Sequence, residues 1–363
     1  MVTLEFFAGL IALVLGAEAL VRGASRLAGA FGVSRLVVGL TVVAFGTGAP
    51  EVAVSVGAAW GGQTDVAVGN VIGSNILNVL LILGLAALIT PLAVDTQLVR
   101  QEVPIMIGAS LLFAAMALDG RISLTDAMIL MAGMLSYTAF LLVQARQASR
   151  QCMSPDEPGD AASHSAPSAD RSWDDLLPVQ LLLIVAGLAL LVFGADALVD
   201  ASVTFARALG VSELVIGLTL VAAGTSLPEI ATSVMAAVRG ERDIAVGNVV
   251  GSNVFNILGC LGLAAFASGT GLEVPDAALR FDLWVMLVVA VACLPVFVTG
   301  REIARWEGAV FLLYYVAYVA YLILASQSHA ALDVFSHVML SFVVPLTIIT
   351  LVVTLLPKGD GRR

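Results

Sequence analysis

The stretch GLTVVAFGTGAPEVAVSV, residues 39–56, returns 178 positions later as GLTLVAAGTSLPEIATSV, residues 217–234. The same offset holds without a gap over 72 aligned positions, 43 of which are identical. Each copy places one acid, Glu51 or Glu229, directly after a proline inside an apolar run. Matched acids beside helix breakers in two hydrophobic halves are typical of a single ion site that both halves share.

A second block keeps the offset, with GNVIGSNILN at 69–78 and GNVVGSNVFN at 247–256. Its polar residues recur at steps of four, which places them on one face of each predicted helix. These matched positions are Asn70, Ser74, Asn78, Asn248, Ser252 and Asn256. Hydrogen bonding between helices is an alternative role for the two serines. Packing or capping is the favoured role for Asn70, Asn75, Asn248 and Asn253.

Composition indicates that lipid surrounds most of this chain. It is 60% hydrophobic and 12% charged, with a mean hydropathy of +1.01. Such values lie far outside the range of soluble domains. A single lysine and no basic patch argue against nucleic acid as a partner. We expect membrane lipid and transported cations as partners, and we expect no cofactor. The sequence does not indicate the oligomeric state.

Eleven apolar runs predict membrane-spanning helices, since a span needs about 20 residues. They lie near 3–21, 36–60, 65–89, 102–118, 124–144, 177–199, 213–238, 243–267, 281–299, 306–325 and 334–356. The first half has five spans, and because five is odd, the second half enters the membrane upside down. The predicted fold class is an all-α integral membrane protein. It has about ten core helices as two inverted five-helix repeats, and an eleventh helix at the C-terminus.

Basic residues predict the orientation in a cell or inner membrane. With the N-terminus outside, fourteen Lys and Arg residues fall in cytoplasmic loops and the tail, against only Arg121, Arg207 and Arg280 outside. The rule that basic loops stay in the cytoplasm therefore places the central linker and the C-terminus inside.

The domain organisation follows from the repeats. The first repeat covers 1–145 and contains the first repeated motif segment at about 39–84. A cytoplasmic linker covers 146–175. The inverted second repeat covers 176–326, with the matching segment at about 217–262. Residues 327–363 form the extra transmembrane helix and a basic cytoplasmic tail.

The site predicted at the two acids has oxygen ligands alone. A proline at position 50 or 228 removes one N–H and frees the carbonyl four residues earlier, and in lipid such carbonyls need partners. Carbonyl groups that would join the carboxylates belong to Ala44, Thr47, Ala222 and Thr225. A site without Cys or His favours a hard cation, namely Ca²⁺, Na⁺ or, less favoured, Mg²⁺.

These residues resemble the two alpha-repeats of the sodium/calcium exchanger family, within the cation/calcium antiporter superfamily. The family signature G-T-S-x-P-E stands complete at 224–229, and G-S-N-x-x-N occurs at 73–78 and 251–256. Length and linker resemble the prokaryotic calcium/sodium antiporters. The resemblance implies a calcium site at Glu51, Glu229 and the carbonyls of Thr47 and Thr225. It implies sodium ligands at Ser226, Ser74, Ser252, Asn78, Asn256 and the carbonyls of Ala44 and Ala222.

Two positions depart from that family pattern. Gly48 stands where the family usually has serine, which removes a hydroxyl from a sodium position. Asn256 stands where some members carry aspartate, so the site has one ionisable group fewer. Both departures affect the number and affinity of sodium ions, and neither touches the expected calcium ligands.

The favoured function is a secondary antiporter that exchanges Ca²⁺ for Na⁺ by alternating access. A Ca²⁺/H⁺ exchanger on the same fold is the first alternative, since buried acids could take up protons in place of sodium. A channel or ion sensor is the second, because half-helices also build channel filters. An enzyme is not expected, since no nucleophile–base pair or nucleotide motif occurs.

The linker should be dispensable for transport. It carries no apolar run, and it is rich in Ser, Pro, Ala and Asp. Replacing 153–170 with a Gly/Ser linker of equal length should preserve ion exchange in proteoliposomes. A folded but inactive protein would contradict this expectation.

Gly48 suggests a second substitution. From the sequence alone, Gly48→Ser should tighten sodium dependence by supplying the missing hydroxyl. Calcium affinity measured without sodium should change little, because the expected calcium ligands do not include position 48.

Overall fold

The computed structural model describes residues 2–152, 176–209, 222–327, 329 and 331–355 of the chain. These residues form an all-helical membrane protein. Within them, nine helices are long and apolar enough to cross a membrane, or ten if one bent pair counts as a span.

The first half contains eight helices, α1–α8, with three π-helical segments and two short strands. The helices are α1 (Val2–Phe31), α2 (Arg35–Val38), α3 (Ala44–Thr47), α4 (Ala49–Trp60), α5 (Thr64–Leu77), α6 (Gly84–Ile89), α7 (Val103–Ala117) and α8 (Leu124–Cys152). The π-helical segments are Gly39–Val43, Asn78–Leu83 and Leu98–Glu102, and the strands are β1 (Leu92–Ala93) and β2 (Arg121–Ile122).

The described part of the second half repeats this order and adds a C-terminal helix. Its helices are α9 (Leu177–Ala208), α11 (Ala222–Gly224), α12 (Leu227–Val238), α13 (Arg242–Phe255), α14 (Gly262–Ala267), α15 (Leu283–Val298), α16 (Arg305–Ser326), α17 (Ala331–Val338) and α18 (Val344–Leu355). The π-helical segments are Asn256–Leu261, Ala278–Asp282 and Met339–Val343, and the strands are β3 (Leu272–Glu273) and β4 (Glu302–Ile303).

Three helices continue well beyond the apolar runs that predicted them. α1 continues ten residues beyond position 21, α8 continues to Cys152, and α9 continues to Ala208. α1 ends where Gly32 takes φ 62°, with its N–H bonded to Gly29 and the N–H of Val33 bonded to Ala28. This is the Schellman arrangement, for which glycine is the preferred residue. Helix length therefore follows the stop signal, whereas hydropathy marks only the part that lies in lipid.

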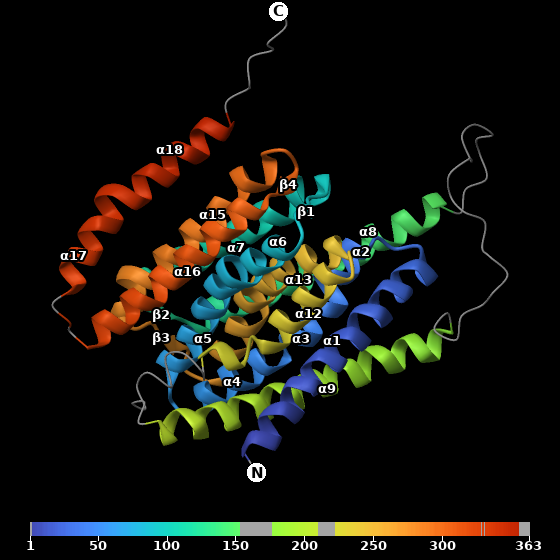
Figure 1. Ribbon diagram of the computed structural model, residues 1–363, viewed down its shortest axis with the longest axis horizontal. Coiled ribbons are helices and arrows are strands. Elements are labelled where there is room, and N and C mark those ends of the chain that lie inside the picture. The colour runs from blue at the N-terminus through green and yellow to red at the C-terminus, as the bar shows by residue number, and fades with distance from the viewer. Residues whose placement is uncertain (1, 153–175, 210–221, 328, 330, 356–363) are drawn as a thin grey trace, which may run out of the picture.

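The strand pairs support the inverted arrangement of the halves. β1 pairs with β4 and β2 pairs with β3, both antiparallel. β1 and β2 lie at opposite ends of α7, so the two small sheets lie at opposite ends of the bundle (Figure 1). β1 corresponds in the repeat to β3, and each lies at the other end of the molecule. A twofold relation between upside-down halves produces this exchange.

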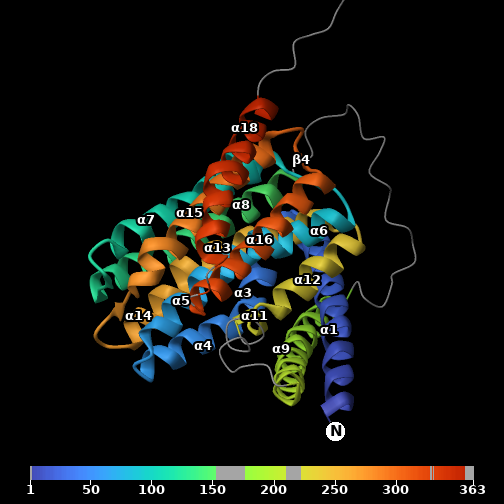
Figure 2. The same cartoon turned by 60° about the vertical axis from the view of Figure 1, so that its left-hand side comes forward.

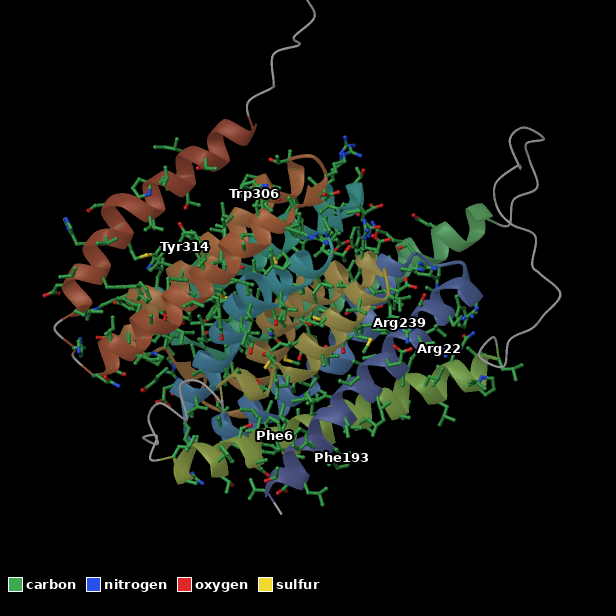
Figure 3. All side chains as sticks on the ribbon, in the orientation of Figure 1. Phe6, Arg22, Phe193, Arg239, Trp306 and Tyr314 are labelled. Carbon is green, nitrogen blue, oxygen red and sulfur yellow. The ribbon has the colours of Figure 1, made fainter. Side chains whose placement is uncertain are left out.

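α1 and α9 form a long antiparallel pair along one side of the bundle (Figures 1 and 2). Glycines allow their backbones to touch: a Cβ atom at Gly187 would lie 2.7 Å from the Leu20 nitrogen and 2.8 Å from the Gly16 oxygen. Small residues at such crossings permit the close packing that joins helices in lipid. Arg239 at the end of α12 (Figure 3) bonds to Glu18 on α1 and ties this pair to the core.

The innermost spans are Thr64–Ile89 and Arg242–Ala267. In their apolar 18-residue stretches, 72% and 83% of the residues are buried. In the corresponding stretch of α9, only 28% of the residues are buried. The polar blocks of the sequence therefore lie at the centre of the protein, away from lipid. The C-terminal helix 331–355 stands outermost and contacts α16 through a 2.6 Å hydrogen bond between Tyr314 and Thr347.

Candidate ion-binding site

A helix is broken just before each Pro-Glu pair. In the first half the helical run 35–47 and α4 meet at Gly48 with a bend of 43°. In the second half α11 ends at Gly224 and α12 begins at Leu227 after a turn. Each proline lies in the first turn of the following helix, where its missing N–H is tolerated. Neither segment therefore forms one continuous helix, as the glycine and proline residues predict.

The two acids are buried together. Glu51 and Glu229 are each 1% exposed, and their charges are close enough to interact. Both lie in the first turn of a helix, α4 or α12, where the partial positive charge of the N-terminus favours an anion. Within the described ranges, no basic side chain forms an ion pair with either carboxylate. A buried pair of carboxylates is stable only when a bound cation or protonation compensates its charge.

The Glu51 side of the site has a hydroxyl bridge. The Ser226 hydroxyl donates to Glu51 Oε1 at 2.9 Å and lies 3.3 Å from the Ser74 hydroxyl oxygen. Ser226 comes from the second half, whereas Glu51 and Ser74 come from the first. The halves therefore meet at Glu51 through a direct contact from the broken helix of the second half.

The matching Glu229 side lacks this bridge. Among the described atoms, the Ser252 hydroxyl is buried without a hydrogen-bond partner, and neither carboxylate oxygen of Glu229 accepts a hydrogen bond of ordinary geometry, although the Thr47 hydroxyl lies near this carboxylate. Glu51 Oε2 is also without a hydrogen-bond partner. Buried polar atoms are nearly always paired, so several unpaired oxygens in the two repeat segments are consistent with a ligand site.

Threonine and asparagine cross-link the halves twice, in the same way. Thr47 donates to Asn248 Oδ1 at 3.3 Å, and Thr225 donates to Asn70 Oδ1 at 3.3 Å. Each asparagine amide then donates to a serine four residues after an acid: Asn70 to Ser55 at 3.0 Å and Asn248 to Ser233 at 2.9 Å. The asparagines thus hold the broken helices in position, and the backbone carbonyls of the threonines stay separate from these bonds.

Ser55 and Ser233 were missed by the sequence reasoning. Both keep the 178-residue offset and both are fully buried, so the repeat itself carried the signal. Cys260 was also missed, and its thiol lies 3.3 Å from the Glu51 carbonyl oxygen. Ile82 matches Cys260 in the first half, so no repeated pattern marks this cysteine.

Asn78 and Asn256 each begin a π-helical segment next to the site. The Asn78 amide nitrogen donates a hydrogen bond to Asn253 Oδ1 at 3.0 Å. The side-chain oxygens of Asn78 and Asn256 are buried without a hydrogen-bond partner in the described structure. π-helical segments inside longer helices frequently occur at functional sites.

The alanine carbonyls complete the predicted set. Ala44 is buried, and its carbonyl accepts the Gly48 N–H at 3.1 Å, which leaves one lone pair for another partner. Ala222 is the first residue of α11, and its side chain lies outside the described structure.

A comparison with protein families matches this chain to the model of the sodium/calcium exchanger protein over residues 1–143 and 179–324. The inner membrane protein YrbG of Escherichia coli K12 is 40% identical over 283 residues, covering 78% of this chain and 84% of its own length. The sodium/calcium exchanger MaX1 of Methanosarcina acetivorans is 34% identical over 358 residues, covering 89% of this chain and 99% of its own length.

The fold also matches a solved structure. The sodium-calcium exchanger NCX_Mj, studied without Na⁺ and Ca²⁺, superposes with a TM-score of 0.71 and 31% sequence identity. The match covers 88% of this chain and 98% of that one.

Proposed function

Because the chain belongs to the sodium/calcium exchanger protein family, we propose that it is an antiporter that moves Ca²⁺ out of the cytoplasm as Na⁺ enters. It is a multi-pass membrane protein and a cation/calcium exchanger, not an enzyme. The identity of the counter-ion, its ligands and the direction of transport are the parts that we propose.

The proposed calcium ligands are the carboxylates of Glu51 and Glu229 with the carbonyls of Thr47 and Thr225. The support is electrostatic. Two buried carboxylates interact with each other and have no basic partner in the described structure, so one Ca²⁺ would neutralise both.

Unpaired neutral oxygens are the observation that favours sodium over protons as counter-ion. The oxygens of Ser252, Asn78 and Asn256 are buried and lack partners within the described residues. A proton needs one carboxylate oxygen, whereas a hard metal cation takes several neutral and charged oxygens at once. The proposed sodium ligands are Ser226, Ser74, Ser252, Asn78, Asn256 and the carbonyls of Ala44 and Ala222.

Coupling follows from competition for the same acids. Calcium binds the carboxylates of Glu51 and Glu229 directly, and sodium at its own ligands needs the same two negative charges for compensation, so one ion must leave before the other binds. The empty site carries two buried charges without compensation, which disfavours the change between inward-open and outward-open states. We place the N-terminus outside and the linker and C-terminus in the cytoplasm of an inner or plasma membrane, on the charge rule.

The test is ⁴⁵Ca²⁺ uptake into sodium-loaded proteoliposomes, with and without an outward sodium gradient and with a proton ionophore. Sodium-driven uptake that survives the ionophore is the expected result. Uptake driven only by a pH gradient would identify a Ca²⁺/H⁺ exchanger, and calcium flux with no counter-flow would identify a channel.

A further inference from the structure

The two halves of the ion site differ at one matched position. Ser226 supplies the hydroxyl that donates to Glu51 and contacts Ser74, and Gly48 stands at the matched position in the first half, with Glu229 and Ser252 as the matched partners. The missing group is therefore the one that would join Glu229 to Ser252, and the buried oxygens of these two residues lack hydrogen bonds of ordinary geometry in the described structure.

An aromatic ring occupies the space beside Gly48. A Cβ atom at Gly48 would lie 2.9 Å from Phe255 Cδ1 and 3.0 Å from Cε1. On its other side the ring approaches Gly259, where a Cβ atom would lie 3.0 Å from Cδ2. Phe255 also stacks on Phe45, with ring centroids 4.9 Å apart at 28°. Two glycines and a stacked ring thus enclose Phe255.

The repeat gives an internal comparison for each of these residues. Subtracting or adding the offset of 178 matches Phe255 with Leu77, Gly259 with Leu81, Phe45 with Ala223 and Gly48 with Ser226. In the half that keeps the serine, the matched residues are aliphatic or small. Where it has glycine, two aromatic rings fill the volume. Close packing requires such compensation, because a cavity or an overlap would each destabilise the core.

We propose that Phe255 is a specificity-determining residue, whose ring occupies the place of a hydroxyl ligand beside Glu229. Sodium bound on that side then has one oxygen ligand fewer than sodium bound beside Glu51. This inference rests on the proposed sodium/calcium exchange and refines its counter-ion side. Gly48→Ser alone does not deliver the tighter sodium dependence expected from the sequence, because the new Cβ collides with the ring.

The test compares four purified proteins: the natural chain, Gly48→Ser, Phe255→Leu, and both changes together. Thermal unfolding is followed as NaCl replaces choline chloride without calcium, since a ligand that binds only the folded state raises its unfolding temperature. The double variant should reach half-maximal stabilisation at about five-fold lower sodium, the factor that one ordinary hydrogen bond contributes. Half-saturating calcium, titrated without sodium, should move less. Each single variant should lack this sodium shift: one has no room for the hydroxyl and the other has no hydroxyl.

Three results would overturn the inference. If Gly48→Ser alone equals the double variant, the ring moves aside freely. If Phe255→Leu alone equals it, the hydroxyl is irrelevant. If sodium and calcium shift equally, the pair shapes the whole ion site. A natural chain that sodium does not stabilise would instead refute the proposed counter-ion, and the choline series separates this failure from the others.

Discussion

Glu51→Gln and Glu229→Gln should each abolish calcium exchange in proteoliposomes while the protein stays folded. The change keeps the size of the side chain and removes one charge and one strong oxygen ligand. Removing one partner of a buried pair of opposite charges, here a carboxylate that faces the calcium ion, costs about 3–5 kcal/mol. This corresponds to a loss of more than about 100-fold in calcium affinity. Both side chains are almost fully buried, so solvent cannot restore the lost interaction.

When calcium is absent, the same variants should be at least as stable as the natural chain. In the ion-free protein the two carboxylates repel, so neutralising one should leave the unfolding temperature in chelator equal or higher. Calcium should raise the unfolding temperature of the natural chain but not of either variant. Glu5→Gln, an exposed acid on α1, is the matched control and should behave as the natural chain. Normal exchange in one glutamine variant would remove that residue from the site.

Gly187→Leu should separate α1 from α9 and destabilise the protein. Its Cβ would lie 2.7 Å from the Leu20 nitrogen and 2.8 Å from the Gly16 oxygen, and both are backbone atoms that cannot turn away. Overpacking of this kind costs about 1–3 kcal/mol or more. Leucine is a good helix former, so a lower unfolding temperature reports on packing and not on helix propensity.

Gly108→Leu in α7 is the control for that substitution. Gly108 is exposed, and its Cβ position has no heavy atom within 4 Å. This variant should unfold at the temperature of the natural chain or above it, in detergent and with the same method. Equal unfolding temperatures for the two leucine variants would show that the α1–α9 contact contributes little.

Much of the fold could be predicted from local features of the chain. Hydropathy located the spans, the odd number of spans in the first half predicted the inversion of the second, and the glycine and proline residues predicted the broken helices. These features depend on residues that are close in sequence, since a helix stop or an apolar run acts within a few turns. The repeat also brought Glu51 and Glu229 to attention as one pair.

The tertiary structure decided how the site is assembled across the halves. A fixed offset matches Ser226 with Gly48, but it does not say that the Ser226 hydroxyl reaches Glu51, which is 175 positions away. Nor does it say that Phe255 fills the space beside Gly48, because that contact depends on the way in which the broken helices cross. Sequence by itself determined which groups enter the membrane interior and where helices break. Packing between distant segments determined which oxygens remain unpaired, because contacts such as those of Ser226 with Glu51 and of Thr47 with Asn248 need a partner from the other half.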